Sequence, residues 1–215
     1  MLAALVYAAL PKTLAQRVLL LPECGTLLLW VGPYSLQKGR HRYMAPCFRQ
    51  PHFFPMDQNI REGIVKELVA LLTQGNAHAT FTDACANIPV ALVNKRVPEL
   101  PYTVWQLAEH IRIAQWDIVE FCISAEHHSP AWPAGYWPAP ETAVDEAAWH
   151  STLAQIAADR DRFVALLHDP NQELLAPLPH GTGQTLLREA LLIGDHTAYH
   201  TGQIILVRRL LHNWE

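Results

Sequence analysis

Long segments with helical spacing, separated by proline-rich stretches, constrain this chain more than any other feature. Apolar residues recur every three or four positions through 58–73, which places them on one face of an α-helix. Further helices are expected over about 103–124, 143–168 and 183–212, with a shorter piece at 81–87. The segment 129–140 contains four prolines, which predicts a loop. The sequence therefore predicts an all-α protein whose four long helices form a four-helix bundle.

Two local signals place helix ends. Gly75 and Asn76 stop the first helix. Thr142, followed three residues later by Asp145, resembles a capping box at the start of the third long helix.

The charge distribution divides the chain near Met56. Residues 1–55 carry six basic residues and one acidic residue, a net charge of +5, whereas 56–215 carry ten basic and 19 acidic residues, a net charge of −9. We expect 56–215 to form the bundle. The irregular extension 1–55 is then either disordered or lies upstream of a native start at Met56, and we favour the second reading. A signal peptide is disfavoured, because Lys12 follows the first apolar stretch instead of preceding it.

Composition narrows the classes of partner. The net charge of −4 argues against general nucleic-acid binding, and the absence of any run of 18 uncharged apolar residues argues against a transmembrane helix. Four cysteines are scattered without a C-x-x-C pair, which favours free thiols in a reducing cytoplasm over a disulfide framework.

Two histidines on the last expected helix carry the main chemical signal. His196 and His200 are four residues apart, so their imidazoles lie on one helix face, as a shared divalent metal requires. Ile193 and Val207 lie on the same stripe, which indicates that this face points into the bundle. Buried imidazoles need partners, because an unsatisfied polar group costs about 1–3 kcal/mol. A metal ion would satisfy both, but a hydrogen-bonded structural role is also open.

The second long helix offers a third imidazole. His110 lies on a stripe with Leu107 and Ala114, and Asp117 follows two turns further along. Three histidines with a vacant position is the open arrangement of catalytic metal sites. Asp117 could orient a ligand, bind a substrate or act as a base, and Gln203 could steer a proton or contact a substrate. Both residues also have a structural interpretation. Asp117 could be a surface or supporting residue, and Gln203 could be a packing and hydrogen-bonding residue.

Three separated segments resemble the DinB/YfiT-like superfamily of small metal-binding four-helix bundles. They are PYTVWQLAEHIRIAQWDIVEF (101–121), SPAWPAGYWP (129–138) and DHTAYHTGQIILVRRLL (195–211). The resemblance covers about 56–215 and leaves 1–55 out. It implies a metal triad of one histidine on the second helix and an H-x-x-x-H pair on the last. These correspond to His110, His196 and His200.

The resemblance also implies a function class. Family members typically hold zinc or nickel, and many are homodimers. Better-characterised members transfer or isomerise small molecules with bacillithiol, mycothiol or glutathione, and others are described as metal-dependent hydrolases. We therefore expect a metal-dependent enzyme that activates a thiol or water towards a small electrophilic molecule. The alternatives are a non-catalytic metal-binding or sensing bundle, and a bundle without metal.

Overall fold

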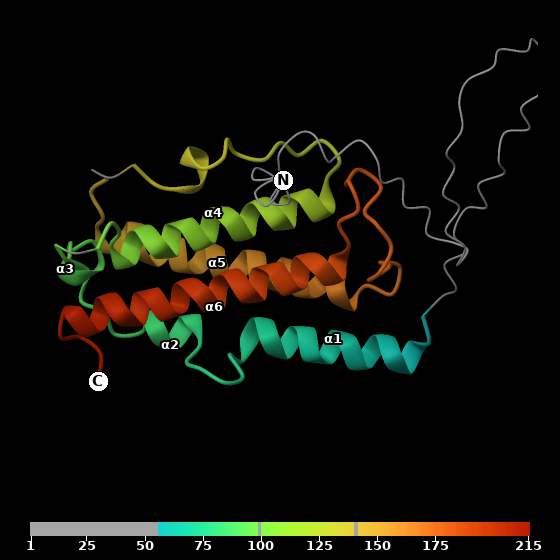
Figure 1. Ribbon diagram of the computed structural model, residues 1–215, viewed down its shortest axis with the longest axis horizontal. Coiled ribbons are helices and arrows are strands. Elements are labelled where there is room, and N and C mark those ends of the chain that lie inside the picture. Colours follow the sequence, from blue (N-terminus) through green and yellow to red (C-terminus); the bar gives the residue numbers. More distant parts are fainter. Residues whose placement is uncertain (1–55, 99, 140–141) are drawn as a thin grey trace, which may run out of the picture. The chain divides into compact units, whose positions relative to one another are not determined.

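The computed structural model describes residues 56–98, 100–139 and 142–215, and the regular secondary structure in these ranges is helical (Figure 1). The long helices are α1 (Gln58–Thr73), α4 (Val104–Ile123), α5 (Glu146–His168) and α6 (Leu186–Leu210). The short ones are α2 (Phe81–Cys85), α3 (Val90–Val93) and the 3₁₀ turn η2 (Ala134–Tyr136). The described ranges contain no strand beyond an isolated bridge between Pro177 and Thr185. The predicted all-α class is confirmed.

The four long helices pack in a way that positions the inner face of α6. Helix α4 packs against α5 and α6, and α1 packs against the same two helices. One apolar cluster includes Leu107 of α4 and Ile204 of α6, and the other includes Phe163 of α5 and Ile193 of α6. Because α4 and α6 share a core, polar residues on their facing stripes are brought together.

Helix starts follow side-chain capping, with one correction to the sequence prediction. Thr103 and Gln106 form a capping box at α4, which begins at Val104. The capping box expected of Thr142 and Asp145 is wrong. Asp145 is itself the N-cap of α5 and accepts from the amide of Ala148, while the Thr142 hydroxyl donates to the carbonyl of Ala139. An aspartate is a strong N-cap by itself, so α5 starts at Glu146 instead of near 143.

The expectations for 1–55 lie outside the described residues, so the extension and the native start remain predictions. Within the ranges that the structure describes, no helix is both long and apolar enough to cross a membrane.

The contact between α1 and α6 depends on a glycine. A methyl group on Gly194 would lie 2.7 Å from Cδ2 and 2.8 Å from Cγ of Leu71, closer than real contacts allow. Gly202, further along α6, has nothing within 4 Å of the corresponding position. The two glycines therefore differ in what a side chain would meet.

We predict that Gly194→Ala destabilises the protein by about 1–2 kcal/mol, because overpacking against Leu71 outweighs the gain in helix propensity. Gly202→Ala is the matched control and should stabilise by about 0.5–1 kcal/mol. Urea unfolding followed by circular dichroism measures both. Equal effects of the two substitutions would contradict the close approach.

Candidate metal centre

Helices α4 and α6 bring the three predicted histidines together. His110 projects from α4, while His196 and His200 project from consecutive turns of α6. One ring nitrogen from each lies within 4.8 Å of the others, and the Nε2 atoms of His110 and His196 are 3.1 Å apart. His110 and His200 are buried and His196 is half-buried. The cluster is thus compact enough for three imidazoles to contact one small ion.

The ring of His110 is fixed from two directions by the segment after α4. Its Nδ1 lies 2.7 Å from the carbonyl oxygen of Tyr136. A carbonyl can only accept, so Nδ1 carries the proton and Nε2 keeps a free lone pair. The indole of Trp137 stacks on the imidazole with ring centroids 4.0 Å apart and planes 2° from parallel. Both contacts aim the lone pair of His110 at the α6 histidines.

His200 is oriented in a similar way by Gln203. The Nδ1 of His200 donates to Oε1 of Gln203 at 2.6 Å, and the Gln203 amide donates to the Tyr199 hydroxyl at 3.3 Å. With the proton on Nδ1, the Nε2 of His200 keeps a lone pair that is free to bind a metal ion. Gln203 therefore orients His200, a candidate metal-binding residue. Metal-binding histidines usually have such a neighbour, which accepts a hydrogen bond from the second ring nitrogen.

The three imidazoles are held neutral. Burial lowers the pKa of His196 to about 3, with smaller contributions from His200 and His110. Burial also lowers the pKa of His110 and of His200, although the hydrogen bonds to Tyr136 and Gln203 oppose this. A metal ligand must be unprotonated, so these shifts keep the lone pairs available below neutral pH.

The donor set fits a divalent transition metal. Two nitrogen ligands on one tetrahedral zinc ion, each at about 2.0–2.1 Å, lie about 3.3 Å apart. The observed 3.1 Å between Nε2 of His110 and His196 is close to that spacing. Imidazole nitrogens suit zinc, copper, iron and nickel, whereas calcium and magnesium prefer oxygen. The three histidines could therefore hold one such ion.

Asp117 contacts residues outside the histidine cluster. Its Oδ1 accepts from Nε2 of His127 at 2.7 Å, and its Oδ2 accepts from the Tyr136 hydroxyl at 2.5 Å. Burial, with the hydrogen bond and charge of Asp117, raises the pKa of Tyr136 well above its usual value, so the phenol stays a donor. His127 lies in the loop that follows α4, but it is largely shielded from solvent. Its side chain is only 9% exposed, and its ring meets Trp116 edge-on.

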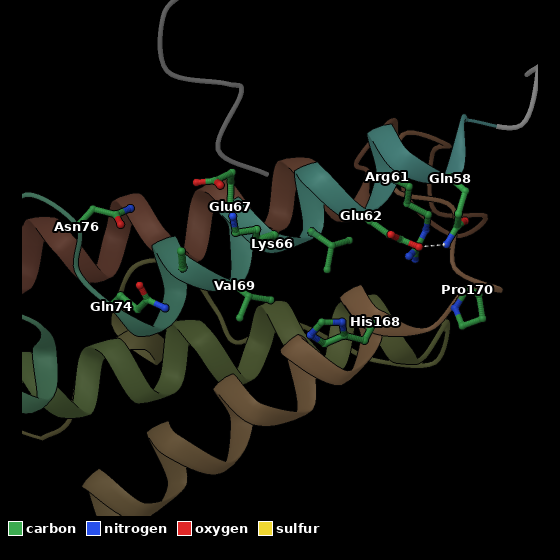
Figure 2. A pocket seen from close by; sticks show the side chains of 12 residues that line it. Gln58, Arg61, Glu62, Lys66, Glu67, Val69, Gln74, Asn76, His168 and Pro170 are labelled. Atoms are coloured by element: carbon green, nitrogen blue, oxygen red, sulfur yellow. Dashed lines mark hydrogen bonds between the residues drawn. The ribbon is translucent and has the colours of Figure 1, made fainter.

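A separate cavity of about 790 Å³ runs along α1 (Figure 2). None of the three histidines lines it. Its walls mix both charge signs, and Arg61 donates to the carbonyls of Leu167, Asp169 and Gln172 near the end of α5. Arg61 thus provides hydrogen bonds to carbonyl groups at the end of α5. The residues that line the cavity do not form a cluster of metal-ligating atoms.

Comparison with known proteins agrees with this architecture. A sequence model of the DinB superfamily matches residues 76–204. The chain belongs to the DinB superfamily. The match includes all three histidines as well as Asp117 and Gln203. No curated protein and no solved structure matches this DinB chain.

Sequence reasoning missed the backbone carbonyl of Tyr136 and the hydrogen bond to His127. A backbone acceptor leaves no trace in residue identity. The pairing of a buried acid with a loop histidine cannot be read from spacing.

The depressed pKa of the histidines predicts a pH dependence of the metal-free protein. His196 has a pKa of 6.5 unfolded and about 3 folded, so the unfolded chain binds more protons between these values. The free energy of unfolding should therefore fall as the pH drops from 6.5 to 5. The slope from this residue is at most about 1.4 kcal/mol per pH unit.

His196→Leu removes this titration and should flatten the fall. Urea unfolding in a chelator at several pH values measures the slope. An unchanged slope in the variant would mean that His196 is not held neutral by the fold.

Proposed function

We propose that this DinB-superfamily protein is an enzyme that holds one divalent ion, zinc or nickel, on His110, His196 and His200. It would use the ion to activate a thiol or a water molecule towards a small electrophilic molecule. The observation that carries the proposal is the convergence of three neutral imidazoles, two of them with their proton fixed on the far nitrogen.

An ion held by three imidazoles keeps a position for a further ligand and lowers the pKa of a water or thiol there to near neutrality. The protein residues have separable roles in this scheme. His110, His196 and His200 would bind the ion. The Tyr136 carbonyl fixes the ring of His110, and Gln203 fixes the ring of His200. Trp137 covers one face of His110 and excludes water from that side.

The choice of a thiol rests on the family resemblance, in which characterised members use low-molecular-weight thiols. A soft thiolate is a good ligand for zinc, so the chemistry is consistent with the site. The homodimer is likewise proposed from the family. Exposed apolar residues on α6 give a second copy a surface to cover; they are Leu191, Tyr199, Leu206 and Leu210.

We predict about one zinc or nickel ion per chain in purified protein, and its loss in His110→Ala, His196→Ala and His200→Ala. His150→Ala is the matched control, because its side chain is 67% exposed on α5. Mass spectrometry of metal content gives the number. Metal retained in all three variants, or absent from the wild type, would contradict the site. The 3.1 Å contact would then be a hydrogen bond between two imidazoles.

Thiol activation predicts that bacillithiol, mycothiol or glutathione raises the melting temperature of the metal-loaded protein and not of His196→Ala. A ligand present at 100 times its Kd would stabilise by about 2.7 kcal/mol. Differential scanning fluorimetry with each thiol measures the shift. Bound metal without a thiol response or turnover of electrophiles would favour the non-catalytic metal-binding or sensing bundle instead.

A further inference from the structure

We propose that Asp117 is a positioning residue for the metal centre, which it serves by clamping the segment 127–137 onto α4 so that the Tyr136 carbonyl holds His110. The inference rests on the proposed metal site and deepens it, because it names the residue that sets the geometry of one ligand from two turns away.

The clamp consists of one carboxylate with two donors from the following segment. Asp117 accepts from His127 through one oxygen and from the Tyr136 hydroxyl through the other, at 2.7 and 2.5 Å. The Asp117 and His127 side chains are only 12% and 9% exposed, so water competes poorly for these bonds. Hydrogen bonds to a carboxyl group are among the stronger ones in proteins, and two of them from one segment fix its path along α4.

The clamp reaches the metal centre through a single residue. Tyr136 is bound at both ends: its hydroxyl donates to Asp117, and its carbonyl accepts from Nδ1 of His110. Trp137, next in the chain, stacks on the same imidazole. Asp117 and His110 are both on α4, so the tyrosine spans a fixed distance between them. Releasing its hydroxyl would free the carbonyl and the indole together.

This geometry argues against a role for Asp117 as a general base. Both carboxylate oxygens already accept a hydrogen bond, and neither donor is one of the three histidines. A base must reach the proton that it removes, within about 2.6–3.2 Å or through one water. The two bonds that Asp117 makes hold the segment that orients His110.

Tyr136→Phe and Asp117→Asn test the clamp. The first removes only the hydroxyl and leaves the carbonyl in the chain. Mutation of a residue that hydrogen-bonds to a metal-bound histidine typically weakens metal binding about 10–100-fold. The clamp is one hydrogen bond further from the metal than such a partner, so we expect zinc to bind about tenfold more weakly in each variant. Competition with a chromophoric chelator measures the affinity.

His180→Gln is the matched control. Its imidazole also fastens a loop to α4, by donating to the carbonyl of Phe121 at 2.6 Å, but it does not contact the histidine cluster. This variant should lose stability in urea unfolding and still bind zinc as the wild type does. Similar loss of zinc affinity in all three variants would mean that Asp117 acts only through general stability.

A second measurement reads the clamp without metal. In chelator-treated protein, nitrogen-15 chemical shifts of His110 should report a proton on Nδ1 in the wild type and in His180→Gln. In Tyr136→Phe and Asp117→Asn, this tautomer should lose population. Unchanged shifts would overturn the clamp. Wild-type protein that shows the expected shifts but binds no zinc would overturn only the proposed function.

Discussion

The site depends on the hydrogen bond between Nδ1 of His110 and the carbonyl of Tyr136. It decides which nitrogen carries the proton, and so which nitrogen can donate a lone pair to an ion. The bond also ties the irregular segment after α4 back to that helix. The packing of α4 against α6 then brings the oriented lone pair to the two histidines of the last helix. Fold and site are therefore linked through one backbone acceptor.

A cluster of neutral imidazoles inside a bundle needs a physical reason to persist. Burial lowers the pKa of all three histidines, so they resist protonation. As neutral rings, they are not stabilised by ion pairs. Two of the rings each make one hydrogen bond away from the centre, and the nitrogens left over converge. This is an arrangement that a bound ion would complete, because it satisfies the remaining lone pairs at once.

The sequence predicted the helices well where capping and periodicity agree. The first long helix has the predicted bounds, because Asp57 caps one end and Gly75 follows the other. The third began later than expected, since Asp145 caps it without Thr142. The histidine cluster could be predicted, because helical spacing fixes which residues share a face. The supporting contacts could not, because Tyr136 acts through its backbone and His127 through a tertiary contact of its loop.

The proposed metal centre holds its divalent ion on three imidazoles and on no other side chain. X-ray absorption spectroscopy of the zinc-loaded protein tests it most directly. We predict three imidazole nitrogens at about 2.0–2.1 Å and one further ligand from solvent or added thiol. A fourth ligand from a protein side chain, such as a cysteine sulfur at about 2.3 Å without added thiol, would describe a closed structural site. That result, or fewer than three imidazoles, would contradict the account.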